Sequence, residues 1–440
     1  MSAPSASPIT SRMSARGDAR SVALDVLLRA EREDAWVDRA FSAEAARTRL
    51  DPRDRALAAQ LAHGAVKAQR LLDACVLALA DRDPVRLDPV ARCVVRLGAY
   101  QLLLLDRVPP HAAVSTAVDL ATRRRGKGAA GLVNALLRRV ADGGAAWRAA
   151  LPDATAAEAA LVRSYPDWIA EAWAAAYGLD AAKALMDAGN APPETTLRVN
   201  GLRSGARERI HAEAAELGAA LREDPAVPGA LVVEGAVDLA ATRAFAAGDL
   251  VPMSRSAQRI APFLGPEPGM RVLDACAAPG GKAGHIADLL GGGDGLTCVE
   301  RDPGRARALA EALARQGAEG CDLLPVDVFQ LPPDRTGYDR ILVDAPCTGL
   351  GTVGSRPDLR WRRTPDDVDR LAALQRGMID FLVPRLAPGG VLVLSLCTLG
   401  TAESSAADGH PVDARLELRP DEGAGEGFAA VRLAAAPGVR

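Results

Sequence analysis

From about residue 269, short apolar segments alternate with segments of helical periodicity. We expect strands at 272–274, 296–300, 323–327, 340–344 and 391–396, and helices at 283–290, 303–316 and 366–386. Strands that alternate with helices form a parallel, doubly wound α/β sheet, because each helix carries the chain back to the same end of the sheet. Ligands of such sheets bind at the carboxyl ends of the strands. The functional residues of this part are therefore predicted to follow its strands.

The first part of the chain has a different pattern. Residues 21–142 show helical periodicity throughout, with apolar residues recurring at helical spacing in 22–28, 56–66, 71–79, 94–105, 111–125 and 129–140. Residues 151–250 are mixed, with helices expected at 156–163, 167–176, 181–190 and 206–217 and strands at 196–200 and 230–233. We therefore predict a disordered tail at 1–20, an all-helical domain at 21–145, a small α+β connector at 146–252 and the α/β domain at 253–440.

Composition narrows the class of protein. Aromatic residues make up only 3% of the 440 residues, so the cores must be built mainly from Ala, Leu and Val. No run of about 18 uninterrupted apolar residues is present, and the start of the chain lacks the apolar centre of a signal peptide. The seven cysteines form no CxxC pair, and the five histidines have no metal-ligand spacing. We expect a soluble, cytoplasmic protein with reduced thiols, without a structural metal and without membrane contact.

The charge is distributed unevenly along the chain. Residues 1–150 contain 24 Lys and Arg against 16 Asp and Glu, whereas the remaining residues contain 29 against 40. A basic first part favours contact with a polyanion there. A solvated helical surface would give the same counts. The cluster Arg123-Arg124-Arg125-Lys127 is the best candidate for RNA contact, although basic residues at the C-terminal turn of a helix are also favoured by the helix dipole.

The loop after the first strand of the α/β domain contains Cys276, Ala277, Ala278, Pro279, Gly280, Gly281 and Lys282. Its glycines let a ligand approach the backbone, and the following helix offers free N–H donors. A phosphate-binding loop is excluded, because Cys276 stands where the first Gly is needed and Ala283 where Ser or Thr is needed. A dinucleotide fingerprint is excluded because its three-glycine spacing is absent. Glu300, predicted at the end of the second strand, can accept both ribose hydroxyls of an adenosyl ligand, and Asp327, predicted at the end of the third, can reach its adenine.

Two further strands each lead to a cysteine. Cys347 follows the strand that ends at Asp344, and Cys397 follows the strand 391–396. A single cysteine in such a place is usually a small buried apolar residue. Two beside a methyl donor suit C5 methylation of cytosine, in which a thiolate adds to C6 and makes C5 nucleophilic. The second thiol can assist release, Asp344 can hold the base, and Lys282 and the sulfonium of the donor can lower the pKa of the reacting thiol.

The helical part resembles NusB-type RNA-binding domains. The similarity is carried by Asp54-Arg55, His63-Gly64, Leu71-Leu72-Asp73, Arg96-Leu97-Gly98-Ala99-Tyr100-Gln101, Val108-Pro109-Pro110-His111-Ala112-Ala113-Val114 and Val133-Asn134-Ala135-Leu136-Leu137-Arg138. These motifs occur in order over nearly the whole predicted bundle. They identify a fold and do not locate a site.

The α/β part, with DACAAPGGK, VDAPCTGLG, Arg356-Pro357-Asp358-Leu359-Arg360-Trp361 and SLCT, resembles the Sun/Fmu (RsmB-type) 16S ribosomal RNA cytosine-C5 methyltransferases. Tyr165-Pro166-Asp167-Trp168 and Leu197-Arg198-Val199-Asn200 resemble the connector of the same family. The resemblance covers about residues 21–400 and implies a Rossmann-like domain that uses S-adenosylmethionine. It implies that Cys397 is the nucleophile and Cys347 the release cysteine. It also implies a cofactor site formed by Cys276, Ala277, Ala278, Pro279, Gly280, Gly281, Lys282, Glu300, Arg305, Asp327 and Asp344.

Some positions depart from the family pattern. Leu396-Cys397-Thr398 stands where Thr-Cys-Ser is usual, and Glu403-Ser404 stands where Glu-Asn is usual. Met253-Ser254 replaces a Gln-Asp pair, and Gly425-Glu426-Gly427-Phe428 replaces Asp-Gly-Phe-Phe. The segment after Cys397 is short, so the helix that follows the nucleophile strand in the family is expected to be missing. Both cysteines and the acids are retained, so we expect an active enzyme.

Three alternatives remain at the level of sequence. One is an RNA-binding assembly or antitermination factor whose catalytic half has decayed, which the altered motif and the short tail favour. Another is the same chemistry on transfer RNA, because no residue is seen to read base identity. A third, an amino-group methyltransferase, is disfavoured because it needs no thiol. We expect a monomer that contacts RNA, 16S ribosomal RNA first of all, and not DNA; the substrate base is expected to be unstacked or flipped.

Overall fold

The computed structural model describes residues 18–48, 50–235 and 237–434. The chain forms two compact units, Met1–Leu151 and Pro152–Arg440. Most of the predicted tail lies outside the described residues. Helix α1 starts at Ala19 and is capped by the side chain of Asp18, which accepts a hydrogen bond from the backbone N–H of Arg20.

In residues 18–48 and 50–151 the first unit consists of six α-helices joined by short turns: α1 (Ala19–Arg32), α2 (Val37–Arg47), α3 (Pro52–Ala80), α4 (Pro89–Leu104), α5 (Pro110–Arg125) and α6 (Lys127–Ala149). Two segments predicted separately are one helix, α3, because residues 67–70 between them are compatible with a helix. Asp51 and Asp88 cap α3 and α4, each followed by a proline at the first helical position. Helices α3 and α4 touch closely at Gly64, where a Cβ would lie 2.1 Å from the Tyr100 ring.

The second unit begins with the connector. Helices α7 (Ala156–Arg163), α8 (Asp167–Tyr177) and α9 (Leu179–Asn190) precede an antiparallel sheet of order β2-β3-β1-β4. Its strands are β1 (Thr195–Val199), β2 (Ala220–Glu223), β3 (Ala230–Glu234) and β4 (Leu250–Pro252), and α10 (Ala206–Glu216) and α11 (Arg243–Ala246) belong to the same subdomain. Strands β2 and β4 were not predicted from the sequence. Strand β2 is mostly exposed and β4 has three residues, so neither forms an apolar run.

The rest of the second unit is a sheet of seven strands within the described residues, in the order β10-β11-β9-β8-β5-β6-β7. Strands β5 (Val272–Asp274), β6 (Leu296–Val299), β7 (Asp322–Leu324), β8 (Tyr338–Asp344) and β9 (Leu386–Leu396) are parallel. Strands β10 (Val412–Leu418) and β11 (Phe428–Ala434) are antiparallel additions. The Rossmann-like prediction is confirmed for the parallel part. The sheet as a whole is mixed, because β11 pairs antiparallel with both β9 and β10.

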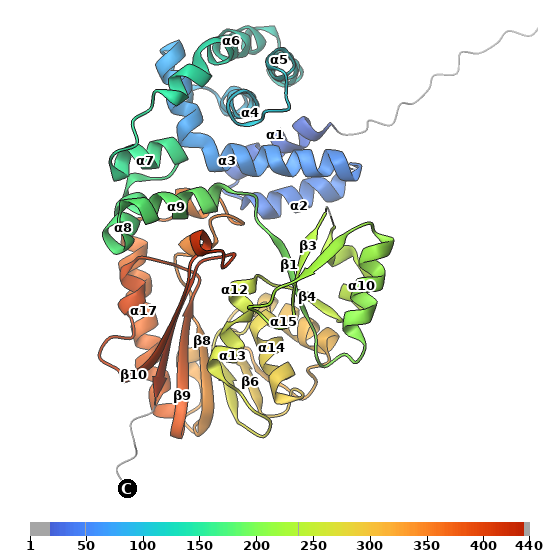
Figure 1. Cartoon of the computed structure of the whole chain (residues 1–440), viewed down its shortest axis with the longest axis vertical. Helices are drawn as coiled ribbons and strands as arrows, with labels where there is room; N and C mark the ends of the chain where they lie inside the picture. Colours follow the sequence, from blue (N-terminus) through green and yellow to red (C-terminus); the bar gives the residue numbers. More distant parts are fainter. Residues whose placement is uncertain (1–17, 49, 236, 435–440) are drawn as a thin grey trace, which may run out of the picture. The chain divides into compact units, whose positions relative to one another are not determined.

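Helices cover both faces of this sheet. On one face α13 (Ile260–Leu264), α14 (Gly281–Leu290) and α15 (Pro303–Gln316) contribute apolar side chains to one buried cluster. On the other face α17 (Pro365–Leu382) packs in a second cluster, and it lies along the sheet as a long helix beside β8–β10 (Figure 1). Short helices α12 (Arg255–Gln258) and α16 (Leu359–Arg362) complete the unit. The side chains of β8 alternate between the clusters, with Leu342 on one face and Ile341 and Val343 on the other.

The connection from β9 to β10 contains no α-helix. The 3₁₀ helix Ala402–Ser405 and a turn occupy it, and the fully buried Ala406 and Ala407 pack against the sheet there. This agrees with the expectation that the helix after Cys397 is missing. A search of the described helices found none long and apolar enough to cross a membrane.

Candidate active site at the carboxyl edge of the sheet

Two thiols meet where β8 and β9 end. The strands are parallel neighbours with Asp344 opposite Ser395, so the loops that follow leave the sheet side by side. The Sγ atoms of Cys347 and Cys397 are 3.2 Å apart, and both residues are half-buried. The sequence prediction that these cysteines lie together is therefore confirmed by the geometry.

The two thiols differ in acidity. A hydrogen bond from Cys347, and in addition the positive charges of Lys282 and Arg356, lower the pKa of Cys397 in spite of burial. The same hydrogen bond and burial raise the pKa of Cys347 well above its ordinary value. The Cys347 thiol can donate to an ionised Cys397, so Cys397 is the member of the pair that ionises first. Cys397 is consequently the better nucleophile of the pair.

A half-buried ion pair lies next to the thiols. Lys282 Nζ is 2.7 Å from Asp344 Oδ2, and Ser395 Oγ donates to Asp344 Oδ1 at 3.2 Å. Burial by itself would lower the pKa of Lys282, but the Asp344 carboxylate outweighs it and raises that pKa. Lys282 Nζ also lies 5.1 Å from the centre of the Phe428 ring. Lys282 therefore stays protonated and supplies a fixed positive charge beside Cys397.

The glycine-rich loop between β5 and α14 is built for close approach. Gly280 has a φ of +103° and donates its N–H to Ala277 O at 2.9 Å, and α14 begins at Gly281. A Cβ at Gly280 would lie 3.1 Å from Leu309 in a backbone conformation that L residues rarely adopt. Ala277 and Ala278 are buried, and Pro279 is exposed. Burial raises the pKa of the Cys276 thiol, so Cys276 is inert compared with Cys397.

The acids predicted for the next two strands differ in position. Glu300 directly follows β6, is 4% exposed and lies 3.3 Å from Arg305, whose guanidinium also donates to Ala278 O at 2.9 Å. These residues link the second strand end to the glycine loop. Asp327 is three residues beyond the end of β7, because that strand stops at Leu324. Its carboxylate accepts from the N–H of Phe329 at 3.0 Å and caps a 3₁₀ helix, so the prediction that it ends a strand was wrong.

Asp274 is an acid of the site that the sequence reasoning used only as part of a strand. It ends β5, and burial raises its pKa to about 7, with the nearby Asp344 carboxylate adding to the effect. Its Oδ1 accepts from the N–H of Cys276 at 3.3 Å, and its buried Oδ2 has no hydrogen-bond partner among the described residues. The strand-end position was the signal that could have identified it.

Glu403 is a second residue whose role was missed. Its side chain is fully buried, and one carboxylate oxygen accepts from the N–H of Thr348 at 3.0 Å and from Gln375 Nε2 at 2.9 Å. The other oxygen accepts from the hydroxyls of Thr348 and Thr401. Thr348 Oγ1 also lies 2.8 Å from Thr398 Oγ1. Since Thr348 and Thr398 directly follow the two cysteines, Glu403 holds both cysteine loops in place.

The predicted RNA-contact cluster lies in the first unit. Arg123, Arg124 and Arg125 end α5, and each pairs with an aspartate of the same unit: Asp18 at 3.1 Å, Asp25 at 2.7 Å and Asp88 at 3.1 Å. Lys127 is exposed. The cluster is therefore partly neutralised by its own unit, and its role in RNA contact stays a prediction. Among the described residues no group of three or more His, Cys, Asp or Glu could hold a metal ion.

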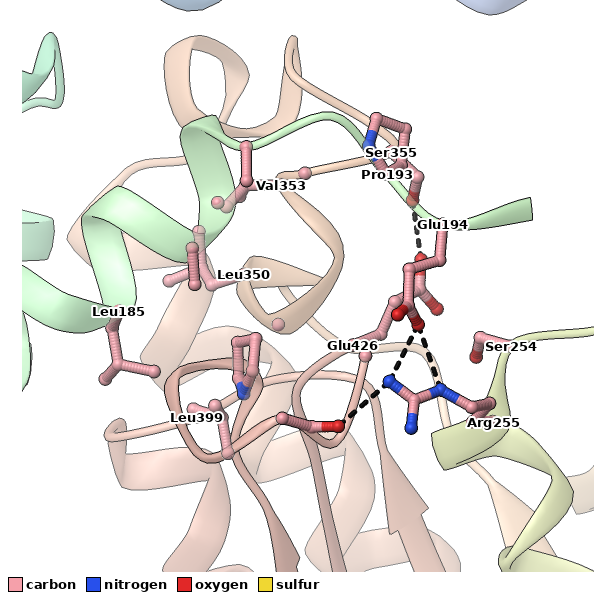
Figure 2. A pocket seen from close by; sticks show the side chains of 18 of the residues that line it. Leu185, Pro193, Glu194, Ser254, Arg255, Leu350, Val353, Ser355, Leu399 and Glu426 are labelled. Carbon is pink, nitrogen blue, oxygen red and sulfur yellow. Dashed lines mark hydrogen bonds and ion pairs between the residues drawn. The ribbon is translucent and has the colours of Figure 1, made fainter. Parts of the chain in front are cut away.

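A cavity of about 410 Å³ adjoins the cysteine loops within the second unit. Leu185 of α9, Leu350, Val353 and Leu399 form apolar walls, and Glu194, Arg255 and Glu426 lie at its polar side (Figure 2). Gly351 also lines it, and the N–H of Gly351 donates to Cys397 O at 3.0 Å. The loops that carry the thiols thus contribute residues to one wall of the cavity.

Comparisons with known proteins agree with this arrangement. Family models match over three stretches: "NusB family" at residues 17–142, "Methyltr_RsmF/B-like, ferredoxin-like domain" at 165–240 and "16S rRNA methyltransferase RsmB/F" at 261–422. The "Probable ribosomal RNA small subunit methyltransferase B" of Synechocystis is 35% identical over 88% of this chain and 87% of its own length. The "Ribosomal RNA small subunit methyltransferase B" of Thermus thermophilus is also 35% identical, over 92% and 90%. The crystal structure of PH0851 shares the fold with a TM-score of 0.77 at 22% identity, over 94% of this chain and 98% of its own.

Proposed function

We propose that this chain, which belongs to the RsmB/F family of S-adenosylmethionine-dependent RNA methyltransferases, methylates C5 of a specific cytosine in RNA through a covalent adduct of Cys397. The observation that carries this proposal is the pair of thiols at the ends of adjacent parallel strands, with Sγ atoms 3.2 Å apart. Methylation of an exocyclic amino group needs no thiol, whereas activation of C5 needs a nucleophile at C6.

The residues around the glycine loop fit the proposed cofactor. Gly280 adopts the left-handed backbone conformation from which α14 starts, Glu300 offers a nearly buried acceptor next to this loop, and Asp274 Oδ2 is an acceptor without a hydrogen-bond partner among the described residues. We assign cofactor binding to Cys276, Ala277, Ala278, Pro279, Gly280, Gly281, Lys282, Glu300, Arg305, Asp327 and Asp344. When bound, S-adenosylmethionine supplies an electrophilic methyl group. We place Asp327 at the edge of this site, because its carboxylate also caps a 3₁₀ helix.

We assign each step of the reaction to particular residues of this chain. The Cys397 thiolate, favoured by Lys282, forms a bond to C6 and raises electron density at C5. Asp344 holds the base and is itself fixed by Lys282 and Ser395. After C5 is methylated, its proton leaves to a base and the electron pair expels Cys397 from C6. Cys347, adjacent to the departing sulfur, assists this release.

We propose that the substrate is 16S ribosomal RNA. The names of the relatives and the excess of Lys and Arg in residues 1–150 support RNA as the partner. The first unit and the connector would hold the RNA mainly by its phosphates and shape, while the target base is flipped toward Cys397. We further propose that the protein works in the cytoplasm as a monomer.

The test uses full-length protein, tritiated S-adenosylmethionine and unmodified 16S ribosomal RNA, with bisulfite sequencing to map 5-methylcytosine. One protected cytosine is expected, and Cys397→Ala should abolish it. Cys347→Ala should retain attack but accumulate protein–RNA adducts that resist denaturation. Methylation that persists in Cys397→Ala would contradict the mechanism, whereas a product only on transfer RNA would contradict the substrate.

A further inference from the structure

The cavity beside the cysteine loops belongs to the second unit, and the proposed reaction does not use it. Its volume of about 410 Å³ lies within the range of about 300–1,000 Å³ that is usual for small-ligand sites. Trp173 borders it and is fixed by a hydrogen bond from Nε1 to Leu399 O at 3.0 Å. The walls are therefore held in place before any ligand arrives.

Several residues that line the cavity belong to the loops of Cys347 and Cys397, where the substrate is proposed to bind. Leu350 and Gly351 follow Cys347 by three and four residues, and Leu399 follows Cys397 by two. The N–H of Gly427 donates to Gly351 O at 2.8 Å, so the loop before β11 closes the same wall. A nucleotide covalently linked to a cytosine at Cys397 must pass close to these loops.

The described residues on the polar side of the cavity can accept hydrogen bonds, and the one positive charge among them, that of Arg255, is paired. Arg255 Nε and Nη2 contact Glu194 Oε2 at 2.9 and 2.7 Å, and Nη1 donates to Asp224 Oδ2 at 2.8 Å. Arg255 also donates to Gly423 O at 2.9 Å. Glu426 accepts from Ser355 Oγ at 2.6 Å, as Figure 2 shows. The two carboxylates that line the cavity, those of Glu194 and Glu426, outnumber its one guanidinium, which disfavours a phosphate and favours a ligand edge rich in N–H donors.

We propose that this cavity binds the nucleobase adjacent to the target cytosine and prefers guanine there. Apolar walls suit the faces of an unstacked base, and recognition of RNA sequence commonly relies on such splayed bases. Guanine carries its N1–H and N2–H groups side by side, which matches the two oxygens of one carboxylate such as that of Glu426. Adenine and cytosine offer a single amino group, and uracil presents carbonyl oxygens on both sides of its N–H. The inference rests on the proposed function, because it assumes an RNA substrate with its target base at Cys397.

The first experiment measures kcat/KM for methylation of RNA fragments in which the base on each side of the target cytosine is varied. Guanine on one side should be favoured at least about tenfold, as expected for one well-paired base contact. Glu426→Gln keeps the size of the side chain but can accept with one atom only, so the preference should fall to within about threefold. Glu422→Gln is the matched control, because it makes the same change on the same loop outside the cavity and should keep the preference. A wild-type enzyme without preference, or a Glu426→Gln enzyme that keeps it, would overturn the proposal.

A second experiment measures binding without the reaction. A fragment with thienoguanine, a fluorescent guanine analogue that keeps the N1–H and N2–H groups, at the favoured position should change its fluorescence when the base enters the cavity, in the absence of S-adenosylmethionine. Ala188→Phe on α9 fills the cavity and should abolish this change, whereas Ala181→Phe, two turns earlier on the same helix and outside the cavity, should not; melting curves check that both fold. If no RNA is methylated but the Ala188-dependent signal is present, the proposed function fails and the base site stands. Methylation with an unchanged signal in Ala188→Phe would remove the base site and leave the proposed function.

Discussion

Replacing Glu403 by alanine tests whether this buried carboxylate holds the cysteine loops together. Glu403 is fully buried and receives four hydrogen bonds, from Thr348 N–H, Thr348 Oγ1, Thr401 Oγ1 and Gln375 Nε2. The backbone N–H of Thr348 and the amide of Gln375 cannot turn to new partners without moving the chain. The alanine variant therefore leaves two buried N–H groups unsatisfied: that of Thr348 and one of the two on Gln375 Nε2, whose other N–H donates to Pro346 O at 2.9 Å.

The expected cost follows from these two donors. An unsatisfied buried donor costs about 1–3 kcal/mol, and the space left by the removed side chain adds to it. Glu403→Ala should therefore lower the free energy of unfolding of the second unit by about 3–6 kcal/mol, a large part of the about 5–15 kcal/mol that holds a typical protein folded.

Glu403→Gln is the matched comparison. Its Oε1 can keep accepting from the Thr348 N–H and from Gln375, while its amide N–H groups face the hydroxyls of Thr348 and Thr401. Hydroxyls can accept as well as donate, so these contacts survive with weaker, uncharged hydrogen bonds. We expect a loss of about 1–2 kcal/mol in the free energy of unfolding.

Urea unfolding of the full chain, followed by tryptophan fluorescence, measures both variants. Trp173 is 2% exposed and bonded to Leu399 O, so it reports on the second unit next to the site. Hydrogen exchange at the Thr348 amide gives a local readout and should speed up strongly in the alanine variant. Equal losses for Gln and Ala, or a loss below about 1 kcal/mol for Ala, would refute the role of the four hydrogen bonds.

Three other variants test neighbouring parts of the site. Lys282→Met should raise the pKa of Cys397, because it removes a positive charge that favours the thiolate. The rate of alkylation by iodoacetamide should therefore rise at a higher pH than in the wild type. An unchanged pH profile would contradict this. Asp274→Asn should gain stability relative to wild type as pH rises from about 4 to 7. Burial raises the folded-state pKa of Asp274 to about 7, so the wild type loses the stability linked to protonation of Asp274 over that range. Parallel plots of unfolding free energy against pH for the two proteins, measured by urea unfolding, would contradict this. Gly351→Ala should lower the melting temperature and the methylation rate, because its Cβ would lie 2.0 Å from Gly427 O, and wild-type values for both would show that the loops are not packed as described.

The sequence predicted those parts of the site that depend on strand geometry. Cys347 and Cys397 are 50 residues apart, yet each follows a strand of the same parallel sheet, and this alone brings them to one edge. The same rule predicted the positions of Glu300 and the glycine loop correctly. The predicted position of Asp327 at a strand end was wrong, because an apolar run does not show where a strand stops and β7 ends three residues earlier than expected.

Strands β2, β4, β10 and β11 show a different limit. They are short, or they alternate apolar and polar residues with little burial on one side, as β10 does. Antiparallel partners are also chosen by contacts between distant segments, such as β9 with β11, and periodicity within one segment carries no information about them. The parallel strands are buried on both faces and so read as apolar runs.

Pairwise polar contacts were the least predictable part, and they set the difference in pKa between the two cysteines. From their positions alone, Cys347 and Cys397 are equally good candidates for the nucleophile, since both follow a strand of the same sheet. The two differ because the hydrogen bond between the thiols and the positive charge of Lys282, which is held by Asp344, lower the pKa of Cys397. Glu403 then fixes the loops in which this asymmetry exists, through partners 28 and 55 residues away. The chemistry therefore depends on contacts that only the folded chain brings together, at an edge that the sequence pattern already locates.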